Sequence, residues 1–274
     1  MILPNRFAEA DCRLLSQTPL ARCYQMRHQG QVYFVRQAIG SHQFLGIDQY
    51  KVQRLQRLAA DAGLAPALHY VDPHSGLFVS QWLGEDNWGA RDLSITQLAQ
   101  ALGTLAARLH GVSIAPLPQA VLRLDVGLRL QHYLSRICRR DPRITSCYHQ
   151  AQRCLAQLPA VPWALCHHDL HPGNLLGDAP WLVDWEYAAL GDPAFELALC
   201  WVTNDLDGAA GAQLLAAYQA AGGQVAAERL ALLLPVARLL VLLWAQLLWE
   251  RFANETFHRL VVQQSQRLFT PEAL

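Results

Sequence analysis

An excess of charge of one sign, closely paired cysteines and internal repeats are all missing from this chain. Its 22 Lys and Arg residues balance 22 Asp and Glu residues, so there is no basic field that would attract nucleic acid. The seven cysteines form no Cys-x-x-Cys pair and their number is odd, which indicates reduced, partly buried thiols. The segment Met1 to Arg6 lacks the charged start and apolar run of a signal peptide, which predicts a cytoplasmic protein.

Long apolar runs are also scarce, with one exception near the carboxyl terminus. Residues 230–249 are apolar enough to span a bilayer, but Pro235, Arg238 and Gln246 interrupt them. We therefore expect a buried helix and no membrane partner. A chain of 274 residues that is 52% hydrophobic is long and apolar enough to bury a substantial core, as one large domain or as two lobes.

The segment that carries chemistry runs from His167 to Asn174 and has the spacing His-x-Asp-x-x-x-x-Asn. Phosphoryl transfer needs a carboxylate to accept the proton of the acceptor hydroxyl, and hard oxygen ligands for Mg²⁺. The same spacing occurs in the catalytic loop of protein kinases, where the acid is the base and the amide binds metal. After a turn at residues 177–180, an apolar run brings Asp184 to a strand end, where kinases place a second metal-binding acid.

Four segments together make the chain similar to a known family. They read HHDLHPGNLL, LVDWEYAALGDPAFELA, LAQALGTLAARLHGV and LFVSQWLGE, and they span roughly residues 77 to 201. The chain resembles the aminoglycoside phosphotransferase and choline kinase superfamily, most closely its bacterial thiamine kinase and choline kinase-type proteins. This resemblance implies a bilobal, protein kinase-like α+β fold, ATP and Mg²⁺ as co-substrate and cofactor, and a small alcohol as acceptor.

The resemblance also assigns roles to residues. It implies that Asp169 is the catalytic base and that Asn174 and Asp184 bind the metal ion. Glu186 follows the Asp-x-Glu pattern of the family, and we expect it to position the loop or to contact the metal indirectly.

The amino-terminal part must supply the nucleotide site, and it fits the family less well. The predicted hairpin at residues 16–24 has no glycine, so we expect Ser16, Thr18 or backbone amides to contact phosphate. The next strand, residues 31–37, contains Arg36 where many kinases have lysine, and arginine can grip phosphate oxygens with two donors. The following helix, about residues 48–62, offers no glutamate. We therefore expect the usual ion pair to be absent or replaced by a neutral hydrogen bond.

The lobes are predicted to meet after the strand at residues 77–81. Backbone groups near Gln81, Trp82 and Leu83 would bind adenine there. We predict a nucleotide-binding lobe over residues 1–84, a small β-sheet with one main helix. A larger and mostly helical lobe would cover residues 85–274, with a capped helix starting at Ser94.

The acceptor is predicted from weaker signals. Aromatic side chains next to carboxylates suit a cationic alcohol such as thiamine or choline, and Tyr187, Trp249 and Glu250 are the preferred contacts. His171 could also face the acceptor. For any one of these aromatic residues, packing in a helical core is a commoner role than binding an acceptor. Ethanolamine, an amino sugar or an aminoglycoside stays open as an acceptor.

Two other classes of function fit parts of the sequence. His167, His168, Asp169 and His171 could bind zinc or iron in a hydrolase, but that hypothesis leaves Asn174 and the Asp-x-Glu strand unexplained. A pseudokinase that binds without turnover would explain the missing glycines and helix glutamate. Against it, the base and both metal-binding positions are present.

Overall fold

The computed structural model describes residues 3–40, 42–118, 122–139 and 141–269, and it divides into two compact units. Unit 1 comprises residues 1–91 and 172–188, and unit 2 comprises residues 92–171 and 189–274. The segment after the catalytic loop thus belongs with the amino-terminal unit. The sequence predicted two contiguous lobes that meet after residue 84, whereas each of the two units contains two separate segments of the chain. The lobes stay a prediction.

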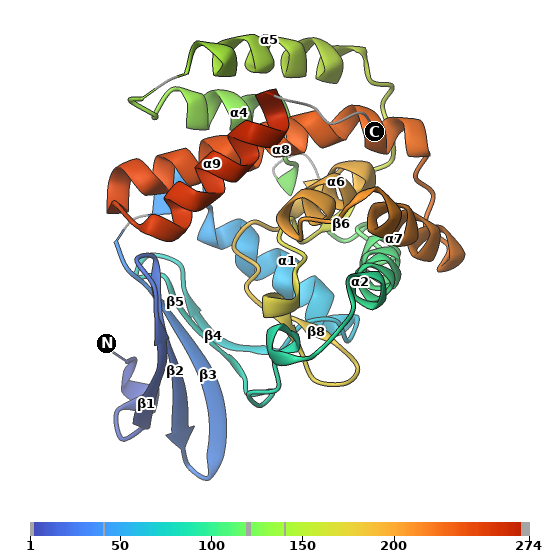
Figure 1. The fold of residues 1–274 in the computed structure, drawn as a ribbon. Coiled ribbons are helices and arrows are strands. Elements are labelled where there is room, and N and C mark those ends of the chain that lie inside the picture. Colours follow the sequence, from blue (N-terminus) through green and yellow to red (C-terminus); the bar gives the residue numbers. More distant parts are fainter. Residues whose placement is uncertain (1–2, 41, 119–121, 140, 270–274) are drawn as a thin grey trace. The chain divides into compact units, whose positions relative to one another are not determined.

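Unit 1 is built on a five-stranded antiparallel sheet (Figure 1). Its strands follow the order β1-β2-β3-β5-β4. Their bounds are β1 Asp11–Gln17, β2 Ala21–His28, β3 Gln31–Ala38, β4 Leu68–Asp72 and β5 Leu77–Gln81. The short 3-10 helices of this unit are η1 Asn5–Phe7, η2 His42–Leu45, η3 Trp88–Ala90 and η4 Pro172–Asn174.

Side-chain alternation along the strands produces the core of unit 1. Phe7, Met26, Val35, Leu77 and Val79 are buried together on the sheet. Because successive residues of a strand point to opposite faces, the other face remains available for a site.

The single long helix of unit 1, α1, spans Gln49–Asp61. Asp48 caps it by accepting hydrogen bonds from the amides of Tyr50 and Lys51. Leu55 and Ala59 are fully buried, and α1 packs against β4. The predicted helix over residues 48–62 is confirmed to within its capping residues.

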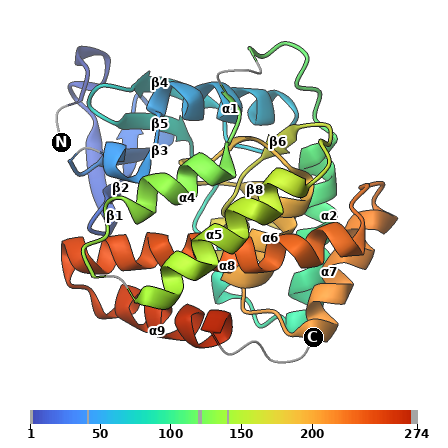
Figure 2. The ribbon, with the colours of Figure 1, turned by 90° about the horizontal axis from the view of Figure 1, so that it is seen from above.

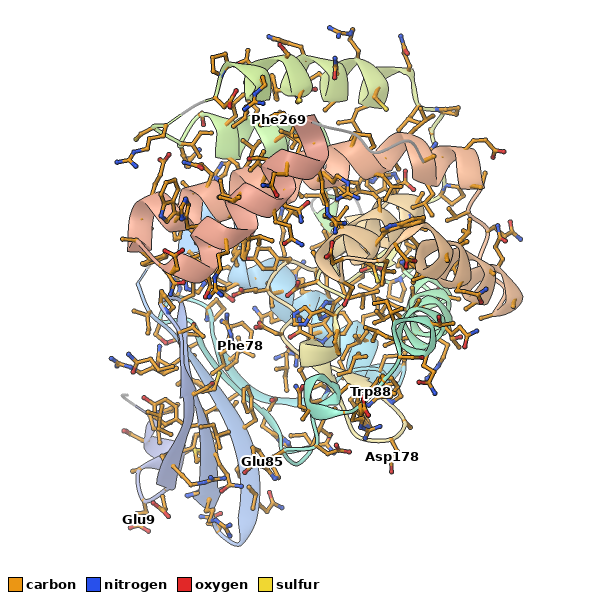
Figure 3. The ribbon with its side chains drawn as sticks, in the orientation of Figure 1. Glu9, Phe78, Glu85, Trp88, Asp178 and Phe269 are labelled. Atoms are coloured by element: carbon orange, nitrogen blue, oxygen red, sulfur yellow. The ribbon has the colours of Figure 1, made fainter. Side chains whose placement is uncertain are left out.

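A small hairpin completes unit 1. Strands β7 Leu175–Leu176 and β8 Trp181–Leu182 pair through the predicted turn at residues 177–180. Trp88 donates a hydrogen bond to the Gly177 carbonyl, and Arg91 lies over the Trp88 ring while pairing with Asp178. Trp88 and Asp178 accordingly lie close together in Figure 3. These contacts explain why residues 172–188 group with the amino-terminal part of the chain.

Unit 2 is mostly helical. Its helices are α2 Ile95–His110, α4 Val126–Leu134, α5 Pro142–Gln157, α6 Pro193–Thr203, α7 Gly208–Ala220, α8 Ala227–Phe252 and α9 Glu255–Phe269. Two short strands, β6 Ala164–Cys166 and β9 Ala189–Gly191, pair on either side of the catalytic segment. Figure 2 shows α4 beside α5 and α8 beside α9.

Close packing of α2 on α7 organises the centre of unit 2. A Cβ atom at Gly103 would lie 2.3 Å from the Leu214 carbonyl oxygen, so only glycine allows this approach. Ser94 and Gln97 form the predicted capping box at the start of α2. Leu102, Leu105 and Leu109 are buried and form the apolar stripe of α2.

Helix α8 contains the apolar run that raised the question of a membrane span. It is the one described helix long and apolar enough to cross a bilayer, and 67% of its most apolar window is buried inside the fold. It contacts α4, α5, α6 and α9 within unit 2. This is the environment expected of a core helix.

Candidate active site

A cavity of about 570 Å³ lies within unit 1, between the sheet, α1 and the segment that follows the catalytic loop. It gathers most of the residues that the sequence assigned to nucleotide and metal. These are Ser16, Arg36, Gln81, Trp82, Leu83, Asn174, Asp184 and Glu186.

Arg36 is the centre of charge in this cavity. Its guanidinium pairs with the carboxylate of Glu186, and its Nε lies 3.5 Å from Oδ1 of Asp184. Burial opposes the charge of Arg36, but the two carboxylates more than offset it and raise the pKa of Arg36 above its ordinary value. Arg36 therefore has an ion pair, although not with the helix that usually provides the acid. The acid comes from the segment after β8 rather than from the helix.

The face that α1 turns to the cavity explains this exchange. Gln49, Val52 and Gln56 line the cavity from α1, and none of them can carry a negative charge. Gln56 instead donates a hydrogen bond to the Pro66 carbonyl at 3.2 Å. Because a buried arginine needs a counter-charge, Glu186 takes the role that a helix acid would otherwise fill.

Asn174 and Asp184 fit the requirements of a magnesium site. Both line the cavity, and both supply the hard oxygen ligands that this ion prefers. The backbone amide of Val183 donates to the Asn174 carbonyl at 3.0 Å, which ties the two segments together. Asp184 has a φ of +59°, a left-handed conformation that costs a non-glycine residue about 1 to 2 kcal/mol. Such local strain is typical of functional positions.

The remaining walls of the cavity are suited to a flat apolar ring. Phe34, Leu68 and Phe78 line it from the sheet, and Phe78 is labelled in Figure 3. The segment Gln81 to Leu83 follows directly along the chain and also lines the cavity. An adenine ring would pack against these apolar side chains and would be oriented by hydrogen bonds to peptide groups, as is usual in small-molecule sites.

The glycine-free hairpin uses a threonine to make its turn. The hydroxyl oxygen of Thr18 accepts hydrogen bonds from the amides of Leu20 at 3.2 Å and Ala21 at 3.0 Å. Thr18 is not among the residues that line the cavity, whereas Ser16 is. Contact of Thr18 with phosphate stays a prediction, and its hydroxyl already has a structural role.

His42 is a residue of this site that the sequence did not reveal. It lies on η2 and is buried, with Nε2 2.8 Å from the Leu20 carbonyl and Nδ1 3.7 Å from Oε2 of Glu186. Burial is the main cause that lowers the pKa of His42. No sequence pattern marks it, because it reaches Glu186 across 144 positions of the chain.

Residues 167–171 of the catalytic loop lie in unit 2, whereas its end at Asn174 lies in unit 1. Asp169 is 28% exposed, and its Oδ2 lies 3.6 Å from Nε2 of His171. His167 and His168 are buried, and His168 has a φ of +61°. A strained backbone therefore stands directly before Asp169, as another does at Asp184.

The buried carboxylate of Glu196 holds this strained backbone. Oε1 of Glu196, on α6, accepts hydrogen bonds from the amides of His167 and His168, each at 2.6 Å. Burial by itself would raise the pKa of Glu196, but the hydrogen bond and charge of His110 and the His168 amide lower it to about 2. The sequence assigned no role to Glu196. Its position eleven residues after Trp185 gives no sign of this contact.

The histidines of the loop do not assemble a metal site in the described part of the chain. There, the one group of three close metal-ligating side chains is His110, Cys166 and Glu196, which includes none of them. A hydrolase built on His167, His168 and His171 thus finds no support in the geometry.

The residues predicted to contact the acceptor are partly engaged elsewhere. Glu250 accepts hydrogen bonds from the amides of Cys138 at 2.7 Å and Arg139 at 2.8 Å. Trp249 stacks on His258 with ring centroids 4.3 Å apart, and the Arg139 guanidinium lies over it at 5.6 Å. Tyr187 and His171 are half-buried. These contacts give Trp249 and Glu250 a structural role, and their part in acceptor binding stays a prediction.

Known proteins similar to this chain are phosphotransferases. A thiamine kinase of Escherichia coli O17:K52:H18 is 30% identical over 197 residues, which are 66% of this chain and 62% of that protein. The chain thus spans less than two thirds of the length of the thiamine kinases it matches.

Solved structures show the same fold. The choline kinase LicA from Streptococcus pneumoniae has a TM-score of 0.74 at 20% identity, covering 94% of this chain and 92% of that one. A spectinomycin phosphotransferase, solved with ADP and spectinomycin, has a TM-score of 0.62 at 14% identity, covering 96% and 89%. The predicted protein kinase-like fold is confirmed.

The model of one protein family matches residues 21–233, which include most of the residues that line the cavity of unit 1, the catalytic loop and α6. With a match over most of its length, this chain belongs to the phosphotransferase enzyme family.

Proposed function

We propose that this protein transfers the γ-phosphoryl group of ATP to the hydroxyl of a small cationic alcohol, thiamine in the first place and choline in the second. The observation that carries the proposal is the cavity of unit 1. It combines an apolar wall for adenine, a buried arginine for phosphate, and an amide and a carboxylate for metal. The ADP held by the spectinomycin phosphotransferase of the same fold supports a nucleotide as its ligand.

Each residue has one task in this proposal. Arg36 grips phosphate oxygens, and Asn174 and Asp184 would hold Mg²⁺, which neutralises charge on the triphosphate. Asp169 accepts the proton of the acceptor hydroxyl as the oxygen attacks. Asn174 follows Asp169 by five positions, so the proposed base and the proposed metal ligand are close along the chain.

Thiamine ranks first because the thiamine kinase relative has the higher identity over a long match. The proposed contacts to its cationic ring are Tyr187, Trp249, Glu250 and His171. ATP is supplied in the cytoplasm, and we propose that the protein works there.

The test is an ADP-release assay with Mg-ATP and a panel of acceptors: thiamine, choline, ethanolamine, amino sugars and aminoglycosides. We expect turnover on thiamine or choline, with product phosphorylation confirmed by mass spectrometry. Turnover confined to an aminoglycoside would replace the acceptor class and keep the reaction. Binding of ATP without turnover on any acceptor would establish the pseudokinase instead.

A further inference from the structure

The turn between β1 and β2 is fixed without any glycine. The hydroxyl of Thr18 accepts hydrogen bonds from the amides of Leu20 and Ala21. The amide of Thr18 in turn donates to the Ala21 carbonyl at 2.9 Å. Pro19 lies inside this turn, and its ring fixes the backbone torsion φ. A glycine would add freedom at this place, so a turn made of these residues is comparatively rigid.

A bulge in β1 directs the residues before this turn into the cavity. The pairing of β1 with β2 skips one residue, Leu15, between Leu14 and Ser16. All three line the cavity, whereas the side chains of a regular strand alternate between its faces. The position of the hairpin therefore decides where Ser16, the predicted phosphate contact, lies in the cavity.

The carbonyl of Leu20 anchors the turn. It accepts hydrogen bonds from the amide of Ile39 at 2.7 Å and from Nε2 of His42 at 2.8 Å. These bonds use both lone pairs of the carbonyl oxygen. Leu20 and His42 are buried, with 9% and 5% of their surfaces exposed. The turn is thus tied to the segment after β3 by a backbone bond and by one buried side chain.

The contact with Leu20 also determines the tautomer of His42. A carbonyl can only accept, so Nε2 carries the hydrogen. Burial is the main cause that lowers the pKa of His42, so the ring is neutral and Nδ1 is an acceptor. Nδ1 has no hydrogen-bond partner among the described residues, and it lies 3.7 Å from Oε2 of Glu186. Two acceptors do not bond each other, so the ring packs beside Glu186 without drawing it away from Arg36.

We propose that His42 is a positioning residue of the nucleotide site, which holds the glycine-free hairpin in a preformed place beside the phosphate groups of ATP. This role depends on the proposed function, since it takes the cavity of unit 1 as a nucleotide site. A preformed hairpin need not be ordered when the nucleotide binds, whereas a flexible loop must be. His42 does not line the cavity itself, so it acts through Leu20 and does not touch the nucleotide.

The first test is hydrogen–deuterium exchange of the peptides that contain residues 17–21 and 36–40, without any ligand. The amides of Leu20 and Ile39 report on the turn, because each donates a hydrogen bond to one of its residues. We expect both to exchange faster in His42→Leu, which removes the donor. His42→Gln has an amide group that can still donate, so its exchange should stay close to that of the wild type.

The same peptides show whether the hairpin is preformed. ADP should leave their exchange unchanged in the wild type, because a preformed hairpin gains no order from the nucleotide. Pro19→Gly introduces a glycine into the turn, so it should speed the exchange, and ADP should then slow it again. His69→Leu makes the same substitution at an exposed histidine of β4 and is the control for His42→Leu.

The second test combines the affinity for ADP, measured by titration calorimetry, with steady-state kinetics on the acceptor found in the panel. His42→Leu should weaken ADP binding and raise the KM for ATP about 10-fold, the effect of one lost buried hydrogen bond. The kcat and the KM for the acceptor should change by less than about 2-fold. His42→Gln should recover most of the loss. A residue with a structural role alone would lower the melting temperature without this split between the two substrates.

Several outcomes would overturn this role of His42. They are unchanged ADP affinity in folded His42→Leu, equal losses in His42→Leu and His42→Gln, and slower exchange of the wild-type hairpin once ADP is bound. If His42→Leu does not fold, Pro19→Gly decides the question, because it loosens the turn and leaves the ring in place. Unchanged exchange and ADP affinity in Pro19→Gly would then overturn the role. A wild type that does not bind ADP would remove the proposed function, and the exchange without ligand would still test whether His42 fixes the hairpin.

Discussion

The residues proposed for nucleotide binding and the residue proposed as base lie in different units and are held by different kinds of interaction. In unit 1 the site is ionic: Arg36 pairs with Glu186 and lies near Asp184, whose side chain is 40% exposed. In unit 2 the loop is held through its backbone, by Glu196 and Asn204. A charged side chain that binds a nucleotide or a metal ion must remain accessible to that ligand. A base that must stay in place is best held by groups that take no part in the reaction.

This comparison leads to four predictions. The nucleotide half should respond to changes of charge, and the catalytic loop should respond to changes of hydrogen-bond geometry.

The largest effect is expected at the base. Asp169→Ala should lower kcat at least 100-fold, the contribution of a positioned general base, and leave the melting temperature within about 2 °C. Steady-state kinetics and thermal unfolding measure the two quantities. Glu228→Ala, which removes an exposed acid of α8, serves as control. A rate near that of the wild type in Asp169→Ala would show that another group takes the proton.

The second prediction concerns acid stability. Because the pKa of Glu196 is about 2 in the folded protein and near 4.5 ordinarily, ionised Glu196 stabilises the fold above pH 4.5. That contribution, on the order of 3 kcal/mol, should be lost as the pH falls from about 5 to 2. Urea unfolding across this range should show a steeper decline for the wild type than for Glu196→Gln. Parallel declines would mean that Glu196 is not ionised in the fold.

The third prediction separates the two halves by their kinetic parameters. Arg36→Ala should raise the KM for ATP about 10-fold or more, since it removes a charged phosphate contact. Glu186→Gln should raise it less, and the double variant should show a coupling of about 1 kcal/mol or more between the two residues. Additive effects would contradict the ion pair. Arg143→Ala, which breaks an exposed pair with Asp141 away from the cavity, is the control.

The smallest effect is expected at Glu250. Glu250→Gln should raise the KM of the acceptor a few-fold and leave that of ATP unchanged, because only the acceptor is cationic. The amides of Cys138 and Arg139 donate to different oxygens of Glu250, and Gln keeps only one of these oxygens, so thermal unfolding of the variant is measured beside its kinetics. An unchanged KM for the acceptor would leave Glu250 with its structural role alone.

Local sequence patterns predicted the helices and strands better than the contacts between distant side chains. The capping box at Ser94, the helix after Asp48 and the strand at residues 77–81 can all be recognised within a few neighbouring residues. The partner of Arg36 could not be recognised in this way. The long helix that follows β3 has no glutamate, and Glu186 lies 150 positions after Arg36 in the chain.

Asp169, Asn174 and Asp184 could be proposed from the sequence because their spacing is short and their chemistry is that of phosphoryl transfer. The sequence also determined the family and the fold, through the resemblance of four segments between residues 77 and 201 to known phosphotransferases. Only the tertiary structure revealed how the site is held. Glu186 reaching Arg36, His42 behind it, and α6 on both sides of Asp169 are contacts between segments that folding brings together. Such contacts depend on burial and distance, which no local pattern records.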